Sequence, residues 1–129
     1  MLNKKIQLSL IITLLFCVNA QAKKPKPQAL TKSEITEKLA GNTVKGNGWS
    51  MLVTKDGKLK GVEGGYGDSG RWHASKDNLF CRTWNSWGQA QESCFQVFIK
   101  KQVRLKFKKV SGPTATFTGK LIAGNPKKL

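Results

Sequence analysis

Apolar and basic residues alternate most clearly between positions 103 and 108, where odd positions are apolar and even positions are basic. A period of two predicts a β-strand with one face toward a core and the other toward solvent. The inward face would carry Val103, Leu105 and Phe107, and the outward face Arg104, Lys106 and Lys108. The same odd-numbered apolar pattern occurs upstream, before an expected turn at Lys100-Lys101-Gln102, in Phe95, Val97 and Ile99.

After residue 42 the chain consists of short β-branched and aromatic segments separated by Gly, Asp and Asn. This pattern predicts strands joined by tight turns, with hairpin turns at Lys55-Asp56-Gly57 and Lys76-Asp77-Asn78. We interpret Gly61–Gly70 as a flexible connection, with a ligand-gating loop as the alternative. The predicted strands are Thr43–Lys45, Trp49–Thr54, Lys58–Glu63, Arg71–Ser75, Leu79–Trp84, Ser93–Ile99, Val103–Val110 and Ala115–Ile122. About eight successive strands favour a small antiparallel up-and-down barrel, because closure leaves no exposed edge strand.

One short helix is expected before these strands. A capping-box pattern, Thr31-Lys32-Ser33-Glu34, precedes Ile35 and Leu39, which lie four residues apart on one helical face. Gly41-Asn42 supplies a stop signal, so the helix should cover about residues 32–40. The expected fold class is therefore all-β with one short N-terminal helix.

Residues 1–22 have the three parts of a secretory signal peptide. Lys4 and Lys5 precede an apolar run, Ile6–Val18, and the small-residue site Ala20-Gln21-Ala22 follows. This 13-residue run is too short to cross a bilayer, so we expect a periplasmic or secreted protein that does not span the membrane. Residues 23–30 predict a flexible basic linker, which leaves residues 31–129 as a single β-barrel domain.

Cysteine usage agrees with export. Cys17 would leave with the signal peptide, so a processed chain would keep Cys81 and Cys94. An even pair in an oxidising compartment predicts a disulfide bond, and two buried free thiols are the alternative. The two cysteines lie on neighbouring predicted strands, so the bond would join strands that already pair.

The formal net charge is +16, and it becomes +14 once the two lysines of the signal peptide are removed. Such an excess predicts attraction to anionic envelope polymers or lipids, although solubility of an exported protein is the alternative reading. No acidic residue interrupts Phe95–Gly119, whereas solvated faces normally mix charges of both signs. No nucleic-acid-recognition motif is present, so no specific nucleic-acid partner is expected. The candidate anion-binding residues are Lys100, Lys101, Arg104, Lys106, Lys108 and Arg82.

Two tryptophans, Trp84 and Trp87, lie near a predicted hairpin tip close to Arg82. They could stack on a sugar ring, base or acyl chain while the guanidinium holds an anionic group. The alternative is that these large aromatic side chains plug one end of the barrel. That alternative fits Trp84 better than Trp87, which is nearer the centre of the loop.

Catalytic motifs find little support in the chain. Gly67-Asp68-Ser69-Gly70 matches the nucleophile segment of chymotrypsin-like proteases, but His73 is the one histidine and the chain is too short for that scaffold. One histidine and two cysteines expected to be bonded leave no tetrahedral metal set. We therefore expect no enzymatic activity, no catalytic residues, no metal and no cofactor.

Several short motifs occur in a recognisable order: Glu34-Ile35, Gly41-Asn42-Thr43, Asp68-Ser69-Gly70-x-Trp72, Leu79-x-Cys81-x-x-Trp84, Cys94 and Gly124-Asn125-Pro126-x-x-Leu129. Together they resemble a family of small exported Gram-negative proteins of unknown function with lipocalin-like character. The resemblance covers about residues 30–129. It implies a lipocalin-like β-barrel with a structural disulfide and a periplasmic location, and it supplies no catalytic residues.

The expected function is that of a non-enzymatic exported binding protein, which engages an anionic cell-envelope component or a small apolar ligand. The alternative is a protein–protein interaction module, either an inhibitor or an accessory subunit, that binds an acidic protein partner. The sequence leaves the oligomeric state open.

Overall fold

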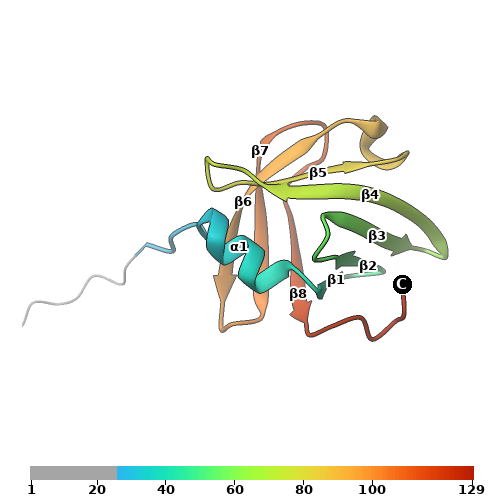
Figure 1. Ribbon diagram of the computed structural model, residues 1–129, viewed down its shortest axis with the longest axis horizontal. Coiled ribbons are helices and arrows are strands. Elements are labelled where there is room, and N and C mark those ends of the chain that lie inside the picture. The colour runs from blue at the N-terminus through green and yellow to red at the C-terminus, as the bar shows by residue number, and fades with distance from the viewer. Residues whose placement is uncertain (1–25) are drawn as a thin grey trace, which may run out of the picture.

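One short helix precedes eight antiparallel strands that close into a barrel in the computed structural model, which describes residues 26–129 (Figure 1). Each strand pairs with the next along the chain, and the last pairs with the first. The elements are α1 (Lys32–Leu39), β1 (Asn42–Gly46), β2 (Trp49–Val53), β3 (Lys58–Glu63), β4 (Tyr66–Ala74), β5 (Phe80–Trp84), the 3-10 turn η1 (Trp87–Ala90), β6 (Ser93–Lys100), β7 (Arg104–Ser111) and β8 (Phe117–Ile122). The expected all-β fold, a small lipocalin-like barrel with one helix, is confirmed. The predicted signal peptide lies outside the described residues.

The N-terminus of α1 is capped as its sequence predicts. Thr31 Oγ1 accepts a hydrogen bond from the Glu34 N–H at 3.2 Å, and Glu34 Oε1 accepts one from the Thr31 N–H at 3.0 Å. The Lys32 N–H donates to Asn78 Oδ1 in the β4–β5 turn at 2.8 Å. The N-terminus of α1 is therefore held by hydrogen bonds within the capping box and by one hydrogen bond to the barrel.

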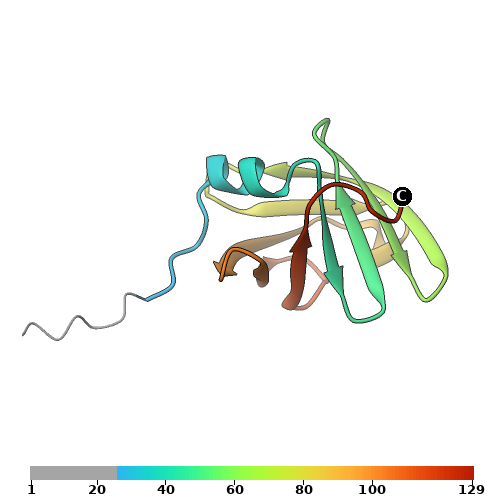
Figure 2. The same cartoon turned by 90° about the horizontal axis from the view of Figure 1, so that it is seen from below.

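Helix α1 closes the end of the barrel at which the β4–β5 turn lies, as the turned view shows (Figure 2). Its two apolar residues, Ile35 and Leu39, are fully buried in the same core as the strand residues. Leu30, the last residue of the predicted linker, is also buried, and its N–H donates to the Val97 carbonyl at 2.7 Å. The ordered packing thus begins just before the helix.

Aromatic rings fill much of the barrel interior. Phe107 stacks on Phe117 with ring centroids 4.4 Å apart, and it meets Phe80 edge-on at 5.4 Å. Phe80 stacks on Trp72 at 5.8 Å, and Phe95 meets Phe117 edge-on at 5.1 Å. Full burial of one such side chain stabilises the fold by about 1.5–3 kcal/mol. The interior is therefore mainly a packed core.

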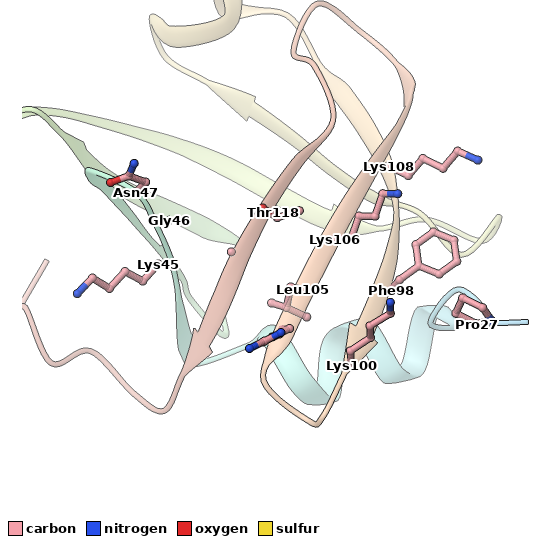
Figure 3. A pocket seen from close by; sticks show the side chains of 12 residues that line it. Pro27, Lys45, Gly46, Asn47, Phe98, Lys100, Leu105, Lys106, Lys108 and Thr118 are labelled. Atoms are coloured by element: carbon pink, nitrogen blue, oxygen red, sulfur yellow. The ribbon is translucent and has the colours of Figure 1, made fainter. Parts of the chain in front are cut away.

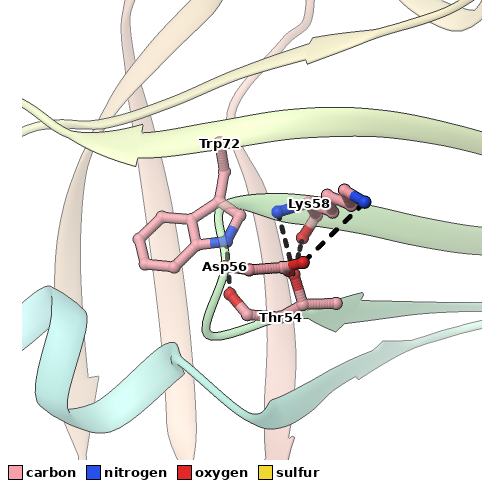
Figure 4. A network of polar contacts seen from close by, with 4 residues as sticks. All are labelled: Thr54, Asp56, Lys58 and Trp72. Atoms are coloured by element: carbon pink, nitrogen blue, oxygen red, sulfur yellow. Dashed lines mark hydrogen bonds and ion pairs between the residues drawn. The ribbon is translucent and has the colours of Figure 1, made fainter.

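Trp72 connects this core to the β2–β3 hairpin (Figure 4). Its Nε1–H donates to the Thr54 carbonyl at 2.8 Å. Thr54 Oγ1 accepts from the Lys58 N–H at 2.8 Å and donates to the Asp56 carboxylate, which lies 3.8 Å from Lys58 Nζ. Gly57 has a φ of 84°, which favours glycine, so the predicted hairpin turn is confirmed at this position.

The interpretation of Gly61–Gly70 as a flexible connection is wrong. Only Gly64 and Gly65 form the turn, and β4 begins at Tyr66, so the protease-like segment 67–70 lies within a strand. Gly61 and Gly70 have no room for a side chain. A Cβ at Gly61 would lie 2.7 Å from the rings of Trp84 and Trp87. The close approach of these rings requires a residue without a Cβ at this position, and the local sequence does not reveal that approach.

One position of the alternating strand was also assigned to the wrong face. Leu105 and Phe107 are buried, but Val103 is 37 % exposed. Lys101 and Gln102 form the predicted turn with φ values of 51° and 64°, and the Val103 N–H donates back to the Lys100 carbonyl at 3.2 Å. Val103 therefore completes the turn, and the inward set of β7 starts at Leu105.

Cys81 and Cys94 form the expected disulfide bond at directly paired positions of β5 and β6. A stable disulfide indicates a compartment other than the reducing cytoplasm. Within residues 26–129, no helix is both long enough and apolar enough to cross a membrane.

Replacing Cys81 and Cys94 together by alanine should lower the free energy of unfolding by about 3 kcal/mol. The disulfide joins cysteines 13 residues apart, and without it the unfolded chain is no longer restrained. Urea unfolding followed by tryptophan fluorescence measures the change. Wild-type protein in reductant should match the variant. An unchanged midpoint would contradict a stabilising disulfide.

Candidate functional site

Four cations lie side by side across the outer face of the barrel. Lys100 of β6 is paired with Arg104 of β7, Arg104 with Lys120 of β8, and Lys120 with Lys45 of β1. All four side chains are exposed. Adjacent strands are about 4.8 Å apart, so this basic row extends over roughly 14 Å. Directly opposed like charges are unfavourable, so the row has an electrostatic cost unless an anion lies on it.

Three members of the basic row, Lys45, Lys100 and Arg104, line a groove of about 680 Å³, and Lys120 lies between Arg104 and Lys45 in the row (Figure 3). Lys106 and Lys108 line the same groove, and the apolar side chains of Phe98 and Pro27 add a less polar margin. The predicted anion-binding residues Lys100, Arg104, Lys106 and Lys108 thus share one surface. Lys101 is exposed in the β6–β7 turn and is not among the groove residues.

Acidic side chains do not neutralise this basic groove. Among residues 26–129 the close pairs of basic and acidic side chains are Lys58 with Asp56, and His73 with Glu92 at 4.0 Å, which is an ion pair only when the histidine is protonated. Neither involves a groove residue. The positive charges therefore face solvent without a protein counter-charge.

Lys45 and Lys120 were missed by sequence reasoning. They are 75 positions apart in the chain, and only the pairing of β1 with β8 brings them together. Each is a lone lysine in a short strand, which by itself is typical of any solvated surface. The sequence contains no local signal that could have identified them.

Arg82 lies beside Trp84 inside the barrel, apart from the outer surface that carries the predicted lysines. It lies between the buried residues Phe80 and Trp84 on β5, so strand alternation turns it into the barrel. Its guanidinium carbon is 4.5 Å from the ring centroid of Phe117 and 5.4 Å from that of Phe95. Burial lowers the pKa of Arg82 to about 10, so the side chain remains charged at neutral pH.

A cavity of about 170 Å³ lies beside Arg82 inside the barrel, and we call it the lumen pocket. Trp84 and Trp87 both line it and meet edge-on at 5.0 Å. Trp84 is only 6 % exposed and belongs to the core, whereas Trp87 is partly exposed. Trp84 therefore packs as a core residue and also faces the pocket. The other lining residues are Trp49, Ser50, Met51, Val62, Glu63, Thr114 and Phe117.

Asp68 holds the loop that carries Trp87. Its carboxylate accepts hydrogen bonds from the N–H groups of Trp87 at 2.9 Å, Ser86 at 3.0 Å and Ser69 at 2.9 Å. Partial burial raises the pKa of Asp68, but these donors outweigh it and leave the pKa below its ordinary value. The acid of the protease-like motif is thus engaged by backbone groups, and no hydrogen bond joins Ser69 to His73 in the described part of the chain.

The described residues contain one cluster of metal-ligating atoms, formed by Cys81, Cys94 and Glu92. The disulfide removes both thiolates, which are the species that bind metal. The cluster is therefore not a ligand set while the cysteines are oxidised.

No family model, curated protein or solved structure matches this chain, so the family resemblance drawn from its motifs receives no support. The disulfide-bonded cysteine pair that accompanied the resemblance is present.

Asp68→Asn should lower the free energy of unfolding at neutral pH by about 1 kcal/mol, because the charge-assisted hydrogen bonds to a partly exposed group become neutral. The wild-type contribution is present above the ordinary pKa of 3.8 and disappears as pH falls through the depressed pKa. The two proteins should therefore converge in acid. Urea unfolding at both pH values measures the difference, and Asp77→Asn in the β4–β5 turn is the matched control. A difference that persists in acid would contradict this role of Asp68.

Proposed function

We propose that this chain is a non-enzymatic, periplasmic or secreted binding protein that engages an anionic cell-envelope component through the basic groove. The observation that carries the proposal is the basic row, four cations in succession across paired strands with no acidic side chain among them. The signal-peptide pattern of residues 1–22 and the disulfide support the location.

A polymer or an anionic surface fits the basic row better than a single small anion. The charges are spaced by one strand each, so repeated phosphate or carboxylate groups can contact several of them at once. Lysine side chains are flexible point charges, which suits varied anions rather than one fixed geometry. Phe98 and Pro27 add apolar contact area beside the charges for the uncharged parts of such a ligand.

An acidic protein partner is the second candidate. Val103 and Val110 are exposed at 37 % and 54 % near the two ends of β7. Apolar side chains beside charges are typical of protein interfaces. In this case the chain would act as an inhibitor or accessory subunit, and binding would require the folded partner rather than a polyanion.

Replacing Lys100, Arg104 and Lys120 by glutamine should weaken binding to a heparin oligosaccharide and to purified lipopolysaccharide by about tenfold or more at low salt. The slope of log affinity against log salt should become shallower by about two to three, since fewer counterions are released. Titration calorimetry across a salt series measures both quantities.

The matched control changes Lys32, Arg71 and Lys76 to glutamine, which are exposed and lie outside the groove. This variant has the same composition and net charge as the test variant, so it separates the position of the charge from its amount. Equal losses of affinity in both variants would mean that the overall charge, and not the position of the basic row, causes the binding. Undiminished binding by the test variant would overturn the proposal, and binding of acidic proteins alone would favour the second candidate.

A further inference from the structure

Arg82 is a cation within a barrel interior made mostly of aromatic and aliphatic side chains. No carboxylate forms an ion pair with it among residues 26–129, and Glu63, the acidic residue of the lumen pocket, is exposed. Arg82 is partly buried, and a charge withdrawn from water without an ion-pair partner is costly. Packing alone therefore does not account for an arginine at this position.

Most N–H groups of the Arg82 guanidinium have no hydrogen-bond acceptor within the described residues. Arginine has five N–H donors, and the recorded acceptor is Met51 Sδ, 3.3 Å from Nη1. Thioether sulfur is a weak acceptor. The Nε atom is buried and has no partner within the described residues. The neighbouring rings of Phe117, Phe95 and Trp84 attract the positive charge but offer no oxygen to these donors.

The lumen pocket lies at the opposite end of the barrel from α1, near the β1–β2 turn and the loop that carries Trp87. Its size of about 170 Å³ corresponds to roughly six water molecules at liquid density. Ligand pockets for larger molecules measure about 300–1,000 Å³, so a long acyl chain or a haem does not fit. Trp49, Trp84, Trp87 and Phe117 provide flat apolar walls.

Buried Ser50 also lines this pocket, but its hydroxyl is not directed into the lumen. Its cross-strand partners are Lys45, which is exposed, and Val62, which is half-buried, so strand alternation directs the Ser50 side chain to the outer face. The Ser50 hydroxyl, which has no hydrogen-bond partner among residues 26–129, therefore does not donate into the lumen. Arg82 is the charged donor on which a ligand would be held.

We propose that the lumen pocket binds a small organic carboxylate with a compact flat apolar body, held by its carboxylate on the Arg82 guanidinium. The planar fork of N–H donors matches the two oxygens of a carboxylate. The aromatic walls match the apolar body, which would leave water on binding. This site is separate from the basic groove and does not depend on the function proposed for that groove.

Benzoate is the probe, and benzamide is its neutral counterpart of the same shape. In titrations followed by nuclear magnetic resonance, benzoate should shift the Arg82 Nε–H signal and the indole N–H signals of Trp84 and Trp87. Benzamide should bind at least about tenfold more weakly, because it cannot form the charge-assisted pair. Inorganic phosphate is included to distinguish a carboxylate site from a general anion site.

Arg82→Met removes the charge while keeping an apolar chain, so it should abolish the preference for benzoate without unfolding the barrel. Arg82→Lys keeps the charge but loses the fork, so benzoate should bind about tenfold more weakly yet still better than benzamide. Arg71→Met, at an exposed position of β4, and the basic-row glutamine variant should bind benzoate like the wild type. Thermal unfolding checks that each variant is folded.

Three results would overturn the proposal. Equal affinity for benzoate and benzamide would mean that the charge is not used. Unchanged benzoate binding by both Arg82 variants would place the ligand elsewhere. If benzoate leaves the Arg82 signal unmoved, whether or not phosphate shifts it, the pocket is not a carboxylate site.

Discussion

The pairing of β8 with β1 is the contact on which the rest of this structure depends. On the inner face it places Val44 opposite Leu121, which encloses the core, and on the outer face it places Lys45 opposite Lys120. It also leaves no unpaired strand edge, which protects a small β-protein from aggregation. The tail that follows β8 is held by the Asn42 side chain, which accepts a hydrogen bond from the Gly124 N–H at 3.0 Å. The same strand pairing therefore encloses the lumen and completes the basic row.

The two candidate sites share an electrostatic property and differ in their exposure to water. Both present cations that no acidic side chain of the described chain neutralises, so an anion would relieve an existing cost. The cations of the basic row are solvated, and ions in solution screen them strongly. Arg82 is partly buried, so an anion bound there would interact with it more strongly and with less sensitivity to salt. The outer surface thus suits large, varied polyanions, and the lumen suits one small anion of defined shape.

Much of the fold could be predicted because local rules govern it. The capping box of α1, the turn at Lys100-Lys101-Gln102 and the alternation of Leu105 and Phe107 each follow from residues that are close in the chain. The glycine-rich start of β4 could not be predicted. Gly70 of β4 leaves room for the β5 backbone, and Gly61 of the paired strand β3 leaves room for the rings of Trp84 and Trp87, so both glycines serve contacts with residues distant in the chain.

Sequence alone determined the number of strands, the charge excess, the cysteine pair and the identity of most groove lysines, since each depends on composition or on a short repeating pattern. Only the tertiary structure decided which charges act together. The charge of Arg82 does not distinguish it from the lysines of β7, but the inward direction of its position on β5 separates it from them. Lys45 and Lys120 had no local signal and join the basic row through barrel closure. A residue's type specifies its charge, but the surroundings of that charge are contributed by strands distant in the chain.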